Sequence, residues 1–188
     1  MSLFRQPASA VLAATTTMPF HGDGGAIVIV DDENVRLTAA LELGGRRPDY
    51  TALQRRCASA FGGAAVHVFT VRHPDGLGLD RRGPVHLHVK QVPGKNTDVE
   101  AAIWLTQQLA RHGDAADNLL LVSGDVDYLA MYSLACDLGV RAGFVAPPGR
   151  SLATALRQVP LGLLGRDVLV ESHRPLRLDH RSVPLAHP

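Results

Sequence analysis

Short, uninterrupted apolar runs alternate along the chain with longer stretches in which apolar residues recur at helical spacing. Two of the runs, AIVIV at 26–30 and LLLV at 119–122, are apolar at every position. Such runs are typical of strands that are buried on both faces of a parallel sheet. Four further strands are predicted at 65–71, 85–89, 140–145 and 167–171, the last of them as an edge strand.

The stretches between these strands predict helices. The clearest is TDVEAAIWLTQQLARHG, in which Thr97 is a candidate N-cap and Gly113 a candidate stop. Asp49, which follows a proline, is a candidate cap for the helix predicted over 49–61. The remaining helices are predicted at 35–43, 127–138 and 151–158. Because strands alternate with helices, we expect an α/β fold, a three-layer α/β/α sandwich around a mostly parallel central sheet of about five to six strands.

These elements fill one compact domain, which we predict to span residues 25–171. Residues 1–24 are rich in Ala and Thr and end in HGDGG, so we expect a disordered or weakly ordered N-terminal tail. Residues 172–188 hold three Pro and three His with little apolar pattern and are predicted to be a C-terminal tail. No apolar run is long enough to span a bilayer, so no membrane association is expected.

Charge and cysteine content narrow the function classes. The formal net charge is +1, so no overall basic field marks a nucleic-acid binder, and any such contact must come from a local patch. Cys57 and Cys136 form no CxxC pair, which favours a reducing compartment and a cytoplasmic location. No cluster of histidines or cysteines has zinc-ligand spacing, because the histidines are scattered over predicted strands and a loop. They are His67, His73, His86 and His88.

Acidic residues follow the two most apolar runs directly. Asp31 comes after AIVIV, and Asp125 and Asp127 come after LLLVSG. Asp98 lies in the first turn of the helix that follows the strand at 85–89. Carboxyl ends of parallel strands, and the helix starts that follow them, meet at one edge of a sheet. We therefore expect the four carboxylates to converge there, although a helix cap or a turn explains each of them singly.

Converging carboxylates predict a divalent-metal site. Carboxylates that are packed together repel one another and are costly to bury unpaired. A hard cation, Mg²⁺ or Mn²⁺, offsets both effects and prefers oxygen ligands. Such a metal activates water for attack on a phosphodiester. Of the neighbouring acids, we expect Asp32 to be solvated or to bind a metal-bound water, with Glu33 as a surface acid.

Three motifs occur in order along the chain: VDDEN holds a strand-ending Asp-x-x-Asn, KNTD holds a Lys-x-x-Asp, and SGDVDY holds a Ser-Gly-Asp-x-Asp-aromatic sequence. In this order they resemble the motifs of the NYN domain, and in particular of its LabA-like group, a branch of the PIN-like metal-dependent ribonuclease superfamily. CDLGVRAGFV matches the helix end that follows. The resemblance covers roughly residues 25–171, and the loop at 73–84 is longer than the family pattern.

The resemblance implies a metal-dependent ribonuclease, a hydrolase whose cofactor is Mg²⁺ or Mn²⁺ and whose substrate is RNA. Asn34 would orient a carboxylate or a water, and Ser123 would help to hold the substrate. The residues that it places in the metal and catalytic site are Asp31, Asp98, Asp125 and Asp127, of which Asp127 is the weakest candidate for direct metal contact.

Basic residues near the predicted site are candidates for holding the RNA backbone. Lys95 could bind a phosphate, and Arg81 and Arg82 could form part of a backbone track. Ordinary solvated surface charge is the alternative for all three. Tyr128 could stack on a base, but packing of its ring on the sheet is the more frequent arrangement for such an aromatic residue.

Other functions remain open at this stage. A catalytically silent RNA-binding or regulatory module on the same fold would carry the same motifs. Related folds often pair, so a homodimer is a further expectation. A phosphoreceiver domain needs an Asp after its third strand and a Lys after its fifth, and this chain has Lys90 and Ala146 at those places. A haloacid-type phosphatase needs Asp-x-Asp-x-Thr, which DDEN does not supply.

Overall fold

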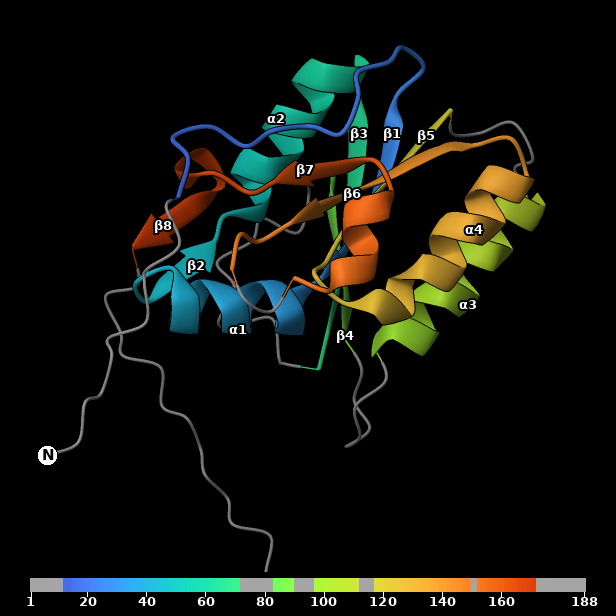
Figure 1. The fold of residues 1–188 in the computed structure, drawn as a ribbon. Helices are drawn as coiled ribbons and strands as arrows, with labels where there is room; N and C mark the ends of the chain where they lie inside the picture. Colours follow the sequence, from blue (N-terminus) through green and yellow to red (C-terminus); the bar gives the residue numbers. More distant parts are fainter. Residues whose placement is uncertain (1–11, 72–82, 90–96, 112–116, 150–151, 172–188) are drawn as a thin grey trace, which may run out of the picture.

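The computed structural model describes residues 12–71, 83–89, 97–111, 117–149 and 152–171. Strands and α-helices alternate in the expected manner (Figure 1). The α-helices are α1 (Asp32–Glu42), α2 (Tyr50–Phe61), α3 (Thr97–Arg111) and α4 (Leu129–Asp137). The strands are β1 (Ala26–Asp31), β2 (Arg46–Pro48), β3 (Ala64–Thr70), β4 (Val85–Val89), β5 (Asn118–Val122), β6 (Arg141–Ala146), β7 (Leu161–Leu163) and β8 (Leu169–Glu171). Three short 3-10 helices are η2 (Val126–Tyr128), η3 (Thr154–Gln158) and η4 (Arg166–Val168).

Six strands form one parallel sheet in the order β4-β3-β1-β5-β6-β7. β1 and β5 lie at its centre, and every residue of β5 is buried. This burial explains why residues 26–30 and 119–122 are apolar at every position, since a central parallel strand is covered on both faces. The predicted fold class, an α/β sandwich with a mostly parallel sheet of five to six strands, is confirmed.

Helices cover both faces of the sheet, α1 and α2 on one side and α3 and α4 on the other (Figure 1). Alternate residues of β1 serve the two layers. Val28 and Val30 pack with the first helix pair, whereas Ile29 packs with the second. This alternation follows from the period of two along a strand. The result is two separate hydrophobic cores, one on each side of the sheet.

The starts of α1 and α2 are set by aspartates. Asp31 caps α1 by accepting a hydrogen bond from the backbone N–H of Asn34, so the helix begins three residues earlier than predicted. Asp49 caps α2 in the same way, as predicted, and its carboxylate accepts from the N–H of Ala52. α2 ends at Gly62, whose positive φ of 73° suits glycine.

The C-terminal part differs from the prediction. Residues 161–163 form β7, the outer strand of the main sheet beyond β6, which the sequence did not indicate. The predicted edge strand at 167–171 is instead η4 followed by β8, and β8 pairs with β2 in a separate two-stranded antiparallel sheet. Three-residue strands carry too little pattern to be recognised from sequence.

The N-terminal segment packs on the domain from residue 12 onward, ahead of the predicted boundary at residue 25. Thr16 is fully buried, and its N–H and hydroxyl both donate to Asp167 at 2.7 Å. The segment runs directly over Gly162 and Gly165, where an added Cβ would collide with the backbone of residues 15–18. The predicted C-terminal tail, 172–188, lies outside the described residues.

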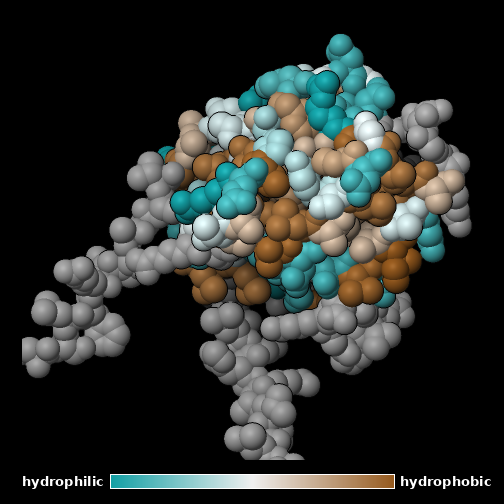
Figure 2. Space-filling view, turned by 45° about the vertical axis from the view of Figure 1, so that its right-hand side comes forward, coloured by the Kyte–Doolittle hydropathy of each residue, from teal (hydrophilic) through white to brown (hydrophobic). Residues whose placement is uncertain are grey.

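The surface is mixed in character. Figure 2 shows brown apolar patches interrupted by teal polar ones on the side toward α3 and α4. The exposed large apolar side chains come from several elements: Leu37, Leu41, Val99, Ile103, Val126, Leu138 and Leu163. Among the described helices, none is both long and apolar enough to cross a membrane.

Candidate metal centre

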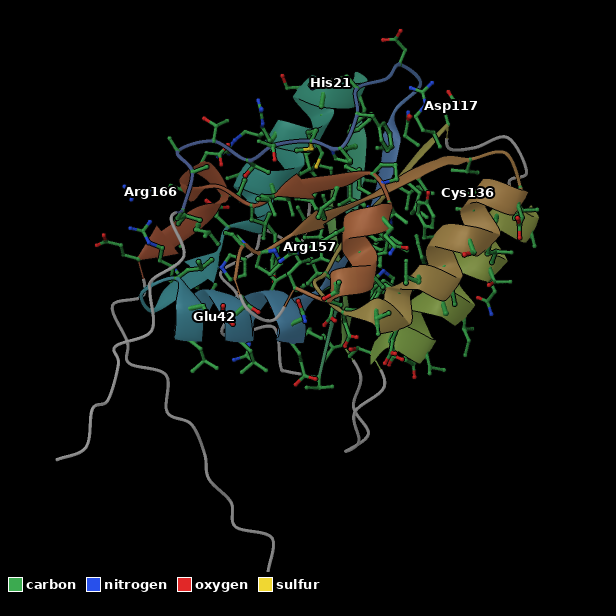
Figure 3. The ribbon with its side chains drawn as sticks, viewed as in Figure 1. His21, Glu42, Asp117, Cys136, Arg157 and Arg166 are labelled. Carbon is green, nitrogen blue, oxygen red and sulfur yellow. The ribbon has the colours of Figure 1, made fainter. Side chains whose placement is uncertain are left out.

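The strand order reverses between β1 and β5. From β1 the sheet extends through β3 to β4, and the chain then returns to the other side of β1 and continues through β5, β6 and β7. Ligands of open parallel sheets gather beyond the carboxyl ends of the strands at such a reversal. Asp31 is the last residue of β1, and Ser123 directly follows β5. Asp117 and His21 lie at the opposite edge of the sheet, so strand length separates them from this site (Figure 3).

The Asp31 carboxylate is only 6% exposed and is held from two sides. One oxygen accepts from the Asn34 backbone N–H at 3.1 Å, and the other accepts from the Ser123 hydroxyl at 3.2 Å. The pKa of Asp31 is raised to about 6, chiefly by burial and to a smaller extent by the charges of Asp125 and Glu33, while the two hydrogen bonds offset part of the shift. Its negative charge is therefore poorly compensated by the protein itself.

The loop after β5 is tied to the start of α1. The Gly124 backbone N–H donates to the Asn34 side-chain oxygen at 2.8 Å. The Ser123 hydroxyl, which donates to Asp31, also accepts from the Asp125 N–H at 3.0 Å. The Asn34 side chain thus holds the backbone of the loop, and the Ser123 hydroxyl links the Asp31 carboxylate to the backbone amide of Asp125. Neither contact was expected from the sequence.

Tyr128 is surrounded by three of the predicted acidic residues. Its side chain is 1% exposed. Burial raises its pKa well above the usual value, and the charges of Asp31, Asp98 and Asp125 add to this effect. The polar Thr97 side chain lies near the Tyr128 hydroxyl and lowers its pKa in part, but no hydrogen bond of good geometry joins the two. Asp31 of β1, Asp98 of α3 and Asp125 of the loop after β5 therefore lie within electrostatic range of one buried phenol.

The hydroxyl of Tyr128 has no hydrogen-bond partner among the described residues. Buried polar atoms are normally paired, and an unpaired one costs roughly 1–3 kcal/mol. The Tyr128 ring is packed in the core of the α3–α4 side, as expected, rather than exposed for stacking. A polar group held beside it would satisfy both this hydroxyl and the neighbouring carboxylates.

The predicted acidic residues are only partly assembled. Asp125 is half-buried and accepts from the N–H of Asp127, whose own side chain is exposed. Asp98 is half-buried in the first turn of α3. Within the described ranges, no three histidine, cysteine or acidic side chains lie close enough to form a ready metal site. The donor chemistry, carboxylate oxygens with uncompensated charge, nevertheless suits Mg²⁺ or Mn²⁺.

The predicted substrate residues Lys95, Arg81 and Arg82 lie outside the described part of the chain.

The expectation that Asp32 is solvated was wrong. Its side chain is 0% exposed, and its oxygens accept from the Tyr50 hydroxyl at 2.6 Å and the Thr70 hydroxyl at 2.8 Å. The guanidinium of Arg36 lies 3.7 Å away. These partners are far along the chain or one helical turn on, so no local signal marks Asp32 as buried. It anchors the turn that carries Asp31.

Three of the histidines that are scattered along the sequence come together in the sheet, although they form no ready metal site within the described ranges. His67 on β3 lies directly opposite His86 on β4. Two residues further along both strands, on the same face, Phe69 lies opposite His88. The rings of His67 and His86 stack with centroids 4.7 Å apart. Nδ1 of His67 lies 3.1 Å from Nε2 of His88. The His-x-His spacing on a predicted strand was the available signal, since it puts both rings on one face.

Comparison with known proteins supports the fold alone. No family model and no curated protein sequence matches the chain. A crystal structure of a Vibrio parahaemolyticus protein of unknown function is similar, with a TM-score of 0.56 and 17% sequence identity. The match covers 78% of this chain and 96% of that one. The architecture is therefore shared with a natural protein.

Proposed function

We propose that this chain is a metal-dependent ribonuclease that hydrolyses RNA phosphodiester bonds. The observation that carries the proposal is Asp31, a buried carboxylate at the strand-order reversal whose pKa is raised to about 6. A carboxylate in this state gains from a bound cation, and perturbed groups of this kind cluster at functional sites. The three motifs that resemble the NYN family supply the reaction class.

Asp31, Asp98 and Asp125 would hold Mg²⁺ or Mn²⁺, and Asp127 would act at the periphery because its side chain is exposed. When bound, the cation would supply an activated water and charge stabilisation for the phosphodiester. Ser123 keeps the Asp31 carboxylate oriented by its hydrogen bond. Asn34 holds the loop that carries Asp125 by accepting from the Gly124 N–H. Lys95, Arg81 and Arg82 are proposed to contact substrate phosphates.

The test is Mn²⁺-dependent cleavage of single-stranded and structured RNAs, compared between the wild-type protein and Asp31→Asn and Asp125→Asn variants. Each substitution removes one negative charge at nearly constant volume. Since loss of a residue that merely orients a metal ligand costs roughly 10–100-fold, loss of a ligand should cost at least about a hundredfold. Asp117→Asn is the matched control, because Asp117 is exposed at the opposite end of β5.

Each outcome bears on the proposal. Cleavage that persists in both site variants would contradict it. RNA binding by the wild-type protein without turnover, in Mn²⁺ and in Mg²⁺, would favour the catalytically silent RNA-binding module instead. Light scattering of the same samples would test the expected homodimer independently of activity.

A further inference from the structure

Three imidazoles share one face of the outer strand pair β3–β4. The parallel register sets His67 opposite His86, and His88 follows two residues later on the same face. The ring centroids of His67 and His88 are 5.4 Å apart, and those of His67 and His86 are 4.7 Å apart. β4 is the outermost strand of the sheet on this side. The three rings therefore form one compact group at the β4 side of the six-stranded sheet.

Two of the nitrogens are already spaced like ligands of one ion. His67 Nδ1 and His88 Nε2 are 3.1 Å apart. Two imidazole nitrogens bound to one tetrahedral Zn²⁺ at roughly 2.0–2.1 Å would lie about 3.3 Å apart. In the metal-free protein one of these nitrogens bears the hydrogen of their mutual hydrogen bond. On metal binding that ring would take its other tautomer, so that both lone pairs face the ion.

The third imidazole is free to approach. His86 is exposed, and its ring lies nearly parallel to that of His67, with 18° between the ring planes. As placed, it stacks on His67 rather than pointing a nitrogen toward the other two rings, which agrees with the lack of a ready three-ligand site in the described ranges. Exposed side chains change rotamer within nanoseconds. Rotation of this one ring would complete the group.

The surroundings keep the buried imidazoles neutral. The pKa of His67 is lowered to about 3, chiefly by burial and to a smaller extent by the neighbouring His86 and His88. Burial lowers the pKa of His88 as well. Phe69 stacks on His88 at 4.4 Å, and Trp104 lies over His67 at 4.1 Å. Metal ions bind the neutral form, so little proton release opposes binding near pH 7.

We propose that His67, His86 and His88 form a binding site for a transition-metal ion of the Zn²⁺, Co²⁺ or Ni²⁺ class, separate from the carboxylates at the strand-order reversal. Imidazole ligands suit these ions, whereas carboxylates suit Mg²⁺ and Mn²⁺. The two regions therefore select different metals. A water would occupy the remaining coordination position on the exposed side.

Trp104 provides a direct probe, because it is the single tryptophan of the chain and lies against His67 and His88. Co²⁺ bound to the three histidines should quench its fluorescence with saturation at one equivalent. Excess Mg²⁺ should not compete. His86→Gln and His88→Gln should each weaken Co²⁺ binding at least about tenfold, since even residues that only orient a ligand give effects of this size. His21→Gln is the matched control, because His21 lies at the amino ends of the strands, where its backbone oxygen accepts from Arg141 at the start of β6 (Figure 3).

His86 is exposed, so His86→Gln tests the site without disturbing the core. Circular dichroism of the His88→Gln variant checks that the more buried substitution folds. Unchanged Co²⁺ affinity in either variant would overturn the three-histidine site. Loss of quenching in Asp31→Asn would also overturn it, because the ion would then belong to the carboxylate region.

Discussion

The carboxylate region at the strand-order reversal and the histidine group on β3–β4 respond to burial in opposite ways. Burial raises the pKa of Asp31 to about 6 and lowers that of His67 to about 3. In both regions the neutral form is favoured, because a low-dielectric environment penalises charge of either sign. The Asp31 carboxylate therefore ionises, and becomes able to bind a cation, as the pH rises through about 6, whereas the His67 imidazole stays neutral until the pH falls toward 3.

The two regions also differ in how they are held. Asp31 is fixed by hydrogen bonds that connect β1, α1 and the loop after β5, and Asp32 beside it is locked by hydroxyls from two other elements. The histidines are held by ring stacking and one mutual hydrogen bond at the margin of the sheet. The difference indicates a rigid oxygen-ligand region and a more adaptable nitrogen-ligand region, and substitutions in each should separate them.

The largest effect is expected at Asp32. Asp32→Ala removes the acceptor of the Tyr50 and Thr70 hydroxyls and leaves the Arg36 guanidinium without its counter-charge. Breaking a buried charged pair from one side costs about 3–5 kcal/mol, so the free energy of unfolding should fall by that amount. Urea unfolding at pH 7 measures it.

The comparison needs two controls in the same assay. Glu33→Gln, one position further along α1, and His86→Gln in the histidine group should each change the free energy of unfolding by no more than about 0.5 kcal/mol. A loss below about 1 kcal/mol in Asp32→Ala would contradict the rigid network. A large loss in His86→Gln would remove the contrast between the two regions.

Opposite pH dependences should follow from the opposite pKa shifts. Asp31 has a raised pKa, so its contribution to stability is complete below pH 3.8 and is lost as the pH rises through about 6. Without metal, Asp31→Asn should therefore gain about 2–3 kcal/mol in free energy of unfolding relative to wild type between pH 4 and 7. His67 has a lowered pKa, so its contribution is present above pH 6.5 and is lost as the pH falls toward 3.

Urea unfolding from pH 4 to 8 in a chelator tests both directions. In His67→Phe, the free energy of unfolding should fall less at acid pH than it does in the wild type. The change in the free energy of unfolding near pH 6, which comes from Asp31, should remain. Addition of Mn²⁺ should raise the wild-type stability above pH 6 and have no such effect on Asp31→Asn, because only the ionised carboxylate binds the cation. Identical pH profiles for the wild type and Asp31→Asn would show that the Asp31 shift is absent.

Sequence alone defined the sheet better than it defined either region. Apolar runs such as 26–30 identified buried strands, and an aspartate at the end of β1 could be assigned to the carboxyl edge from fold class alone. Residues joined across strands could not be found in this way. Asp32 is bonded to Thr70, 38 positions away, and His67 meets His88 through a parallel register that no local pattern sets.

The same distinction, between what strand order sets and what side-chain contacts set, applies to the candidate metal site. The approach of Asp31 and Asp125 follows from two neighbouring strands and was predictable. The placement of Ser123 between them depends on side-chain rotamers and was not. The short strands β2, β7 and β8 were missed or misplaced because their pairing partners, not their own sequences, determine them.

The smallest effect is expected at Tyr128 and sharpens the comparison most. Its buried hydroxyl is unpaired among the described residues, so Tyr128→Phe should stabilise the metal-free protein by about 1 kcal/mol in urea unfolding. If a metal-bound water pairs with this hydroxyl, the same variant should bind Mn²⁺ a few-fold more weakly by electron paramagnetic resonance. Tyr132→Phe, on α4, is the control and should leave Mn²⁺ affinity unchanged. A Tyr128→Phe variant that is less stable without metal would mean that the hydroxyl already has a partner in the protein. Co²⁺ quenching of Trp104 should be the same in both variants, since neither tyrosine belongs to the histidine group.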